Sequence, residues 1–206
     1  MTIMADAPTL FFDLGGVLLT NGWDTGARRR AAEAFGLDFP EFQTRHEMLK
    51  TAFETGRLSL SHYIAKAIFH RPRAFSNQEF KEFMFAQSLL LGDTLDFVRA
   101  LAATGKYRLY TLNNESRELH EHRVRAFGLD AVFRGFLASC YLGQVKPDED
   151  VYLNALGIAS THSDHAIFID DRSLNVEPAI ALGLNAFHFQ GLDGLRGFLK
   201  DRGVTA

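Results

Sequence analysis

Cysteine and long hydrophobic runs are scarce in this sequence of 206 residues. The single cysteine, Cys140, cannot form a disulfide within the chain, which fits a reducing compartment. No apolar run approaches the roughly 20 residues that a membrane-spanning helix needs. The segment from Met1 to Pro8 lacks the basic and apolar regions of a signal peptide. We therefore expect a cytoplasmic protein that has no membrane partner.

An excess of positive charge is also missing. The chain has 22 Lys and Arg residues against 25 Asp and Glu residues, which gives a formal net charge of −3. This balance argues against nucleic acid or an anionic membrane surface as the main partner. Hydrophobic residues make up 47% and charged residues 23%, which excludes a disordered or fibrous chain and indicates a globular fold. The composition leaves the oligomeric state open.

Short apolar runs alternate with helical segments along much of the chain. Apolar runs bounded by turn-forming residues indicate buried strands at Thr9–Phe12, Tyr107–Leu112 and Ala166–Ile169. Segments with helical character lie between and after them, at Leu95–Ala103, Glu115–Phe127, Asp148–Leu156 and Leu174–Leu182. This alternation predicts a doubly wound α/β fold, in which helices cover both faces of a mostly parallel sheet.

The stretch from residue 21 to residue 91 departs from this alternation, because it carries helical patterns and no strand signal. The patterns lie at Ala27–Phe35, Glu41–Phe53, Ser61–Phe69 and Gln78–Leu89. We expect residues 21–91 to form a helical subdomain inserted into a core of residues 1–20 and 92–206. Most of its phenylalanines are expected to form its core, and the triplet Arg28–Arg30 to lie on a solvated helix face.

Polar residues collect at the carboxyl ends of the predicted strands, where parallel sheets bind their ligands. They are Asp13, Asn113, Asn114, Lys146, Asp170, Asp171 and Asn175. Clustered carboxylates repel one another unless a cation lies between them. Mg²⁺ prefers oxygen ligands and leaves positions for water and a substrate phosphate. Three carboxylates, a lysine and several amides at one sheet edge therefore predict a site for a divalent cation and a phosphate.

Four motifs in this order resemble those of the haloacid dehalogenase (HAD) superfamily, and the resemblance covers nearly the whole chain. They are Asp13–Leu18, Leu112–Asn114, Ser139–Asp148 and Asp170–Asn175. The helical insertion between the first two motifs is similar to the α-helical cap of the first type in that superfamily. The start Asp13-Leu14-Gly15 is similar to that of a subgroup that contains bacterial sugar-phosphate phosphatases such as α-glucose-1-phosphatase.

The resemblance implies a Mg²⁺-dependent phosphatase that hydrolyses a small phosphorylated metabolite, such as a sugar phosphate. Asp13 would attack phosphorus to give an aspartyl-phosphate, which water then hydrolyses. The implied ligands of Mg²⁺ are Asp13, the backbone carbonyl of Gly15, Asp170 and Asp171. The implied phosphate-binding residues are Leu14, Gly15, Asn113, Asn114 and Lys146. Lys146 would also pair with Asp13, and Asn175 would orient the metal-binding carboxylates.

Two positions depart from the pattern of the superfamily. Gly15 stands where most of its phosphatases have an aspartate that acts as general acid and base. A missing general acid typically costs ~10²–10⁴-fold in rate, and less when the leaving group is a good one. We therefore expect Gly15→Asp to raise activity on poor leaving groups. Asn113 stands where Ser or Thr is usual, but its amide can still donate a hydrogen bond.

Residues at the entrance to the insertion and on its helices are candidates for substrate contact or for the missing proton donor. They are Asn21, Trp23, Asp24 and His46. Cys140 has apolar neighbours and is expected to be a packing residue rather than a nucleophile.

Two alternative functions stay open. A non-catalytic protein that retains the fold and the metal site would tolerate the changes at Gly15 and Asn113. A 2-haloacid dehalogenase would use Asp13 to displace halide from carbon without a metal. That group carries a bulky aromatic residue where Gly15 stands, and it has less use for the Asp170-Asp171 pair.

Overall fold

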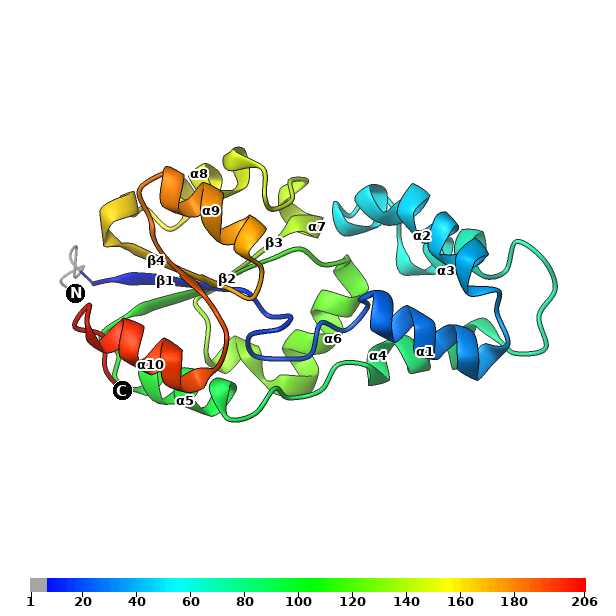
Figure 1. The fold of residues 1–206 in the computed structure, drawn as a ribbon, viewed down its shortest axis with the longest axis horizontal. Helices are drawn as coiled ribbons and strands as arrows, with labels where there is room; N and C mark the ends of the chain where they lie inside the picture. The colour runs from blue at the N-terminus through cyan, green and yellow to red at the C-terminus, as the bar shows by residue number, and fades with distance from the viewer. Residues whose placement is uncertain (1–6) are drawn as a thin grey trace.

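The computed structural model describes residues 7–206 and contains a five-stranded sheet in which neighbouring strands are parallel (Figure 1). The strand order is β3-β2-β1-β4-β5. The strands are β1 (Thr9–Phe12), β2 (Arg108–Asn113), β3 (Gly135–Ala138), β4 (Ala166–Asp170) and β5 (Asn185–His188). The predicted α/β fold with a parallel sheet is thus confirmed. Most of the segment that was examined for a signal peptide, residues 1–6, lies outside the described residues.

The two strands at the edges of the sheet, β3 and β5, are missing from the sequence prediction. Each has four residues, and β5 is only half-buried along its whole length. An edge strand pairs with one neighbour only and is less completely buried than a central strand. Its sequence therefore need not be a continuous apolar run. The three predicted runs correspond to β1, β2 and β4, which lie inside the sheet.

Helices cover both faces of the sheet, as the alternating side chains of β1 require. Leu10 and Phe12 pack in one apolar cluster with α5 (Thr94–Ala103) and α10 (Leu192–Lys200). Phe11 packs in another with α8 (Glu149–Ile158) and α9 (Ser173–Ala181), on the opposite face in Figure 1. Neighbouring residues of a strand point to opposite faces, so both faces of β1 are buried. The remaining elements of this part are α6 (Arg117–Phe127), α7 (Ser139–Leu142), η1 (Leu129–Ala131) and η2 (Ser163–His165).

Four further helices form a lobe beyond the carboxyl ends of the strands (Figure 1). They are α1 (Thr25–Phe35), α2 (Phe39–Glu54), α3 (Leu60–Ala67) and α4 (Asn77–Ala86). We call residues 21–91 the helical lobe. Its helices share an apolar cluster rich in phenylalanine, to which α6 contributes Leu119. The expected helices and their aromatic core are therefore present, and Ser76 and Glu79 form a capping box at the start of α4.

Two chain segments connect the helical lobe to the sheet, and they pair with each other. The backbone N–H of Thr20 donates to Leu89, and that of Leu91 donates to Leu18. The buried guanidinium of Arg123, from α6, donates to the Thr20 carbonyl and to Ser88 Oγ, both at 3.0 Å. It also forms an ion pair of 2.8 Å with Glu115. Arg123 therefore holds both connecting segments from one side.

One member of the arginine triplet is not where the sequence places it. Arg29 and Arg30 are exposed, but Arg28 is only 5% exposed. Its guanidinium donates to the carbonyl of Trp23, to Gln43 Oε1 and to Thr25 Oγ1. The expectation of a solvated face for all three residues is wrong, because successive helical residues are about 100° apart. The first member turns inward on α1.

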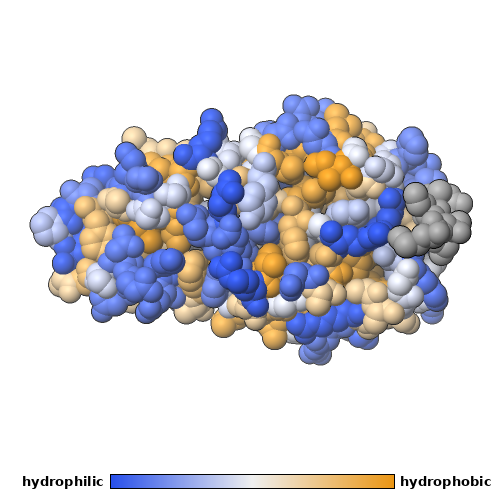
Figure 2. Space-filling view, turned by 180° about the vertical axis from the view of Figure 1, so that it is seen from behind, coloured by the Kyte–Doolittle hydropathy of each residue, from blue (hydrophilic) through white to orange (hydrophobic). Residues whose placement is uncertain are grey.

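Hydrophilic residues predominate in Figure 2 across the middle of the molecule, where the helical lobe meets the sheet. Hydrophobic residues reach the surface in small patches on either side of this band. Between residues 7 and 206, none of the helices combines the length and the apolar character needed to cross a bilayer.

Gly22 lies beside Arg123 and has a φ of +64°. A Cβ at this position would overlap Arg123 Nη2, which its ion pair and hydrogen bonds hold in place. We expect Gly22→Ala to lower the free energy of unfolding by about 2–4 kcal/mol, because backbone strain and overpacking add. Urea unfolding followed by circular dichroism measures the loss.

Gly36→Ala is the matched control for this prediction. Gly36 has a φ of +60°, and no atom of another residue between 7 and 206 lies within 4 Å of a Cβ built there, so an alanine carries the backbone cost alone. That cost is about 1–2 kcal/mol. Equal losses in the two variants would show that Arg123 does not constrain the connecting segment.

Candidate active site

The predicted polar residues meet at the carboxyl edge of the sheet. Phe12 pairs with Ile169 in the parallel register, so Asp13 and Asp170 leave neighbouring strands side by side. β1 lies between β2 and β4, and the chain leaves it toward β2 before returning on the other side through β4. Such a switch in strand order opens a crevice at the carboxyl ends, where α/β proteins bind ligands.

Lys146 is the buried centre of the site. Its Nζ lies 3.0 Å from Asp13 Oδ1 and 2.5 Å from Asp170 Oδ2, and it donates to the Leu112 carbonyl at 2.6 Å. Burial alone lowers the pKa of Lys146. The charges of Asp13 and Asp170 outweigh burial and raise this pKa above its usual range. The ammonium group therefore stays charged and holds the two aspartates together.

Both carboxylate oxygens of Asp170 accept hydrogen bonds from protein groups. Besides Lys146, it accepts from Asn175 Nδ2 at 3.0 and 3.1 Å and from the backbone N–H of Arg172 at 2.9 Å. The side chain has no exposure to solvent. Asp170 is thus placed to orient Lys146, and Asn175 in turn fixes Asp170.

Asp171, in contrast, has only one of its carboxylate oxygens hydrogen-bonded within residues 7–206. Asn21 Nδ2 donates to its Oδ2 at 3.2 Å, while its buried Oδ1 has no hydrogen-bond partner among residues 7–206. Gly16 makes room for this carboxylate, since a Cβ at position 16 would overlap it. A buried carboxylate oxygen without a donor is costly unless a cation binds it.

Ligand oxygens of Asp13, Asp170 and Asp171 all lie within 4.8 Å of one another. Burial raises the pKa of Asp13 to about 6; the charges of Asp170 and Asp171 also raise it, and Lys146 opposes them. This repulsion, together with the orphan oxygen of Asp171, fits a hard divalent cation at the cluster. The site can hold such an ion through Asp13 and Asp171, with Asp170 behind them.

The two asparagines after β2 differ in what they contact. The Asn113 amide is buried, lines the cavity and has no hydrogen-bond partner within the described part of the chain. The Asn114 side chain accepts from the backbone N–H of Lys146 at 2.9 Å and donates to the Lys146 carbonyl at 2.8 Å. The Asn114 amide thus holds the loop that carries Lys146, and it also lines the cavity, so its predicted contact with phosphate stays a prediction.

The remaining predicted positions contribute backbone rather than side chains. The Leu14 side chain is fully buried, and its carbonyl accepts from Leu18 and Leu19 in the turn after β1. Gly15 lines the cavity.

Cys140 lies outside this lining and is buried, which raises the pKa of its thiol to about 12. The prediction that Cys140 is a packing residue is confirmed.

A cavity of about 580 Å³ lies between the sheet edge and the helical lobe. Its lining includes Asp13, Gly15, Asn113, Lys146 and Asn175 from the sheet part. From the lobe it includes the four suggested residues Asn21, Trp23, Asp24 and His46, together with Arg28, Glu47, Lys50, Phe53 and Glu54. The cavity therefore brings both parts of the chain to one place.

Sequence reasoning missed Lys50, Glu54, Glu115 and Arg123, which also line the cavity. His46, Lys50 and Glu54 recur every four residues, so they share one face of α2. That polar stripe was the signal available in the sequence. Burial raises the pKa of Glu54, whose carboxylate accepts no hydrogen bond from the described residues, and Lys50, Arg172 and Arg28 oppose this rise.

His46 is not a proton carrier at neutral pH. Its Nδ1 is hydrogen-bonded to the Tyr63 hydroxyl at 2.8 Å, and this hydroxyl accepts from Trp23 Nε1 at 3.0 Å. Burial lowers the pKa of His46 to about 3, and the charges of Arg28 and Lys50 add to the effect. The imidazole therefore stays neutral, and its hydrogen bond fixes the aromatic wall of the cavity.

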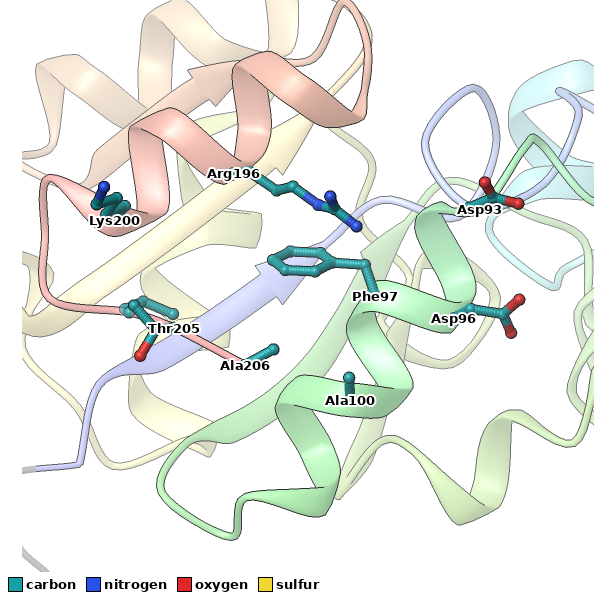
Figure 3. A pocket seen from close by; sticks show the side chains of 9 residues that line it. Asp93, Asp96, Phe97, Ala100, Arg196, Lys200, Thr205 and Ala206 are labelled. Atoms are coloured by element: carbon teal, nitrogen blue, oxygen red, sulfur yellow. The ribbon is translucent and has the colours of Figure 1, made fainter.

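A second hollow of about 490 Å³ lies between α5 and α10, beside the last residues of the chain (Figure 3). Arg196 stacks over the Phe97 ring at 5.2 Å, while Asp93 and Asp96 lie at the start of α5. The hollow shares no lining residue with the first cavity, and none of its charged side chains is buried. It lacks the built-in charge cluster of the first cavity.

A family model described as haloacid dehalogenase-like hydrolase matches residues 7–183. The chain belongs to this family. The HAD resemblance inferred from the four motifs is therefore confirmed.

Relatives and solved structures agree with this assignment. The chain is 28% identical over 174 residues to flavin mononucleotide hydrolase 1 of Arabidopsis thaliana chloroplasts, covering 83% of this chain and 69% of the relative. It is similar in structure to a HAD family enzyme of Bacteroides thetaiotaomicron, with a TM-score of 0.75, 19% identity and coverage of 90% and 95%. Another structure of that enzyme is a complex with magnesium and inorganic phosphate, with a TM-score of 0.70, 20% identity and coverage of 87% and 92%.

An L-2-haloacid dehalogenase also has this fold, with a TM-score of 0.62, 18% identity and coverage of 87% and 82%. At such identities the structural comparisons establish the fold alone. The reaction has to be inferred from the site itself.

Lys146 separates two buried carboxylates, so its removal should be costly. We expect Lys146→Met to lower the free energy of unfolding by about 3–5 kcal/mol, because it leaves Asp13 and Asp170 buried and facing each other. Urea unfolding at pH 7.5 without added metal measures the change. Lys50→Met is the control, since Lys50 lines the same cavity but forms no ion pair within residues 7–206. A loss in Lys146→Met no larger than in this control would contradict the central role of Lys146.

Proposed function

We propose that the protein is a Mg²⁺-dependent phosphomonoesterase that acts on a small polar phosphate ester. The observation that carries this proposal is the cluster of Asp13, Lys146 and Asp171 beside a cavity into which the helical lobe also projects. The flavin mononucleotide hydrolase and the Mg²⁺- and phosphate-bound structure among the similar proteins support it.

Asp13 is the proposed nucleophile. Its carboxylate attacks phosphorus, the bond to the leaving oxygen breaks, and water then hydrolyses the aspartyl-phosphate. Mg²⁺, held by Asp13, Asp171 and the Gly15 carbonyl, would offset the repulsion between the carboxylate and the phosphate dianion. Asp170 acts behind this layer, since its oxygens are taken by Lys146, Asn175 and a backbone N–H.

The proposed phosphate contacts come from groups with donors to spare. Lys146 supplies a charged donor beside Asp13. The Asn113 amide is buried without a partner among residues 7–206, so a phosphate oxygen would satisfy it. Backbone N–H groups at Leu14 and Gly15 would complete the set. Asn114 supports the site by fixing the Lys146 backbone.

We propose that residues 21–91 are the cap and that residues 1–20 and 92–206 form the core. The cap would exclude water from the site and choose the substrate. Its wall is mainly polar and carries Arg28, Lys50 and Glu54. Its aromatic rings are engaged elsewhere, since Phe53 stacks on Tyr63 at 4.2 Å and Trp23 packs on Phe80. A polar wall of this kind favours a hydroxyl-rich substrate such as a sugar phosphate.

Flavin mononucleotide is a second candidate substrate, favoured by the Arabidopsis relative. A flavin ring needs a flat apolar surface, and the two aromatic residues of the cavity, Trp23 and Phe53, already pack against Phe80 and Tyr63. We therefore rank it below the sugar phosphates. A non-catalytic protein and a 2-haloacid dehalogenase remain the alternatives to be tested.

Asp13→Asn should abolish turnover because an amide cannot act as the nucleophile. We expect phosphate release to fall by a factor on the order of 10³ or more. Thermal unfolding should show a folded protein, since the change removes one of three clustered negative charges. The control is Asp164→Asn, which alters an exposed aspartate. Retained activity in Asp13→Asn would rule out the covalent mechanism.

A substrate panel separates the candidate functions. Phosphate release should be measured for p-nitrophenyl phosphate, several sugar 1- and 6-phosphates and flavin mononucleotide, with Mg²⁺ and with chelator. We expect release that depends on both Mg²⁺ and Asp13, highest for the 1-phosphates because their anomeric oxygen leaves easily. Chelator-insensitive halide release from 2-haloacids would identify a dehalogenase. Mg²⁺ binding without any turnover would favour the non-catalytic reading.

A further inference from the structure

The space beside Gly15 is filled by Asn21. A Cβ built on Gly15 would lie 2.9 Å from Asn21 Oδ1 and 3.3 Å from Asn21 Cα. The backbone of Gly15 is not left-handed, so its conformation does not require glycine. A side chain at position 15 would instead have to displace the Asn21 amide, whose oxygen lies nearest. The place where a longer side chain at position 15 would begin therefore already holds an amide from the segment that enters the helical lobe.

Asn21 is fixed in this place from several sides. Its Nδ2 donates to Asp171 Oδ2 at 3.2 Å. The preceding residue, Thr20, pairs with Leu89 through its backbone N–H and accepts from Arg123 through its carbonyl. The following residue, Gly22, packs against the same guanidinium. Asn21 also lines the cavity, so a side chain held by the connecting segments reaches the reacting centre.

An amide nitrogen carries two N–H groups, and Asp171 uses one of them. The other has no acceptor among residues 7–206. An amide can donate a hydrogen bond but keeps its protons, so it can stabilise a developing anion without protonating it. Unlike a carboxylic acid, it would leave the leaving-group oxygen charged.

We propose that Asn21 occupies the place of the general acid that Gly15 lacks. One N–H orients Asp171, and the other binds the leaving oxygen of the substrate. As Asp13 forms its bond to phosphorus, the leaving oxygen departs with the electron pair of the broken bond and then takes a proton from water. This role rests on the proposed phosphatase function, and it limits the enzyme to esters whose leaving group tolerates negative charge.

The leaving-group role is tested with a series of aryl phosphates whose phenols differ in acidity. In the wild-type protein, kcat/KM should fall steeply from p-nitrophenyl phosphate to phenyl phosphate. Asn21→Asp places a carboxyl group at the same spot and should raise the phenyl to p-nitrophenyl ratio about 10-fold or more. Asn154→Asp is the matched control, because Asn154 is exposed and its side chain binds only Gln144 in the described part of the chain. An unchanged ratio in Asn21→Asp would overturn the assignment.

The positioning role is tested without turnover. Calorimetric titration of Mg²⁺ into the Asn21→Ala protein should give an affinity about 10-fold weaker than that of the wild type, because Asp171 loses its orienting donor. Circular dichroism and thermal unfolding of the same sample confirm that the variant is folded. An unchanged affinity in the folded variant would overturn this part of the proposal.

Gly15→Asp gives a third readout, for which the Asn21 contact leads to a different prediction from the one based on the sequence. By itself this variant should not gain activity on phenyl phosphate, because Asn21 blocks the new side chain. Gly15→Asp combined with Asn21→Ala makes room and should gain it. A gain in the single variant equal to that in the double variant would contradict the proposal. An inert wild-type protein would overturn the phosphatase function itself, whereas an active one with equal leaving-group ratios would overturn only the assignment of Asn21.

Discussion

The buried ammonium group of Lys146 is the interaction on which the rest of the site depends. It lies between Asp13 and Asp170 and takes a third contact from the Leu112 carbonyl, so it joins the ends of β1, β2 and β4. Burying two carboxylates without this charge would cost several kcal/mol. Asn114 and Asn175 then serve the same centre, one by holding the Lys146 backbone and the other by holding Asp170.

The single positive charge of Lys146 cannot neutralise three carboxylates. The remaining negative charge suits the site to a cation. Asp171 keeps an oxygen that accepts no hydrogen bond from residues 7–206, and burial raises the pKa of Asp13 to about 6 despite the nearby lysine. The fold tolerates this local cost where a cation and a phosphate would bind. Asp170, which is satisfied by protein groups, and Asp171, which is not, therefore perform different tasks although they are neighbours in sequence.

The helical lobe is coupled to this centre through its connecting segments. Arg123 binds Thr20 and Ser88, which belong to the outgoing and the returning segment, and its partner Glu115 lines the cavity. Asn21, the next residue of the outgoing segment, donates a hydrogen bond to Asp171. Any movement of the lobe relative to the sheet would therefore move the hydrogen-bond donor of the Asp171 carboxylate. This coupling explains the two glycines. Gly15 leaves room for the Asn21 side chain, and Gly22 leaves room for the Arg123 guanidinium.

The sequence by itself determined the sheet centre, the helical insertion and the polar strand ends, because buried strands and amphipathic helices leave local periodic patterns. It also indicated Asp13, Lys146 and Asp170-Asp171 as one cluster, since parallel strands bring their carboxyl ends to one edge. It did not determine the edge strands β3 and β5 or the burial of the Arg28 side chain. Nor did it determine that the Asn114 side chain binds the backbone of Lys146, or that Asn21 fills the space beside Gly15. Those features join residues distant in the chain, and only the packing of the tertiary structure decides which polar group meets which partner.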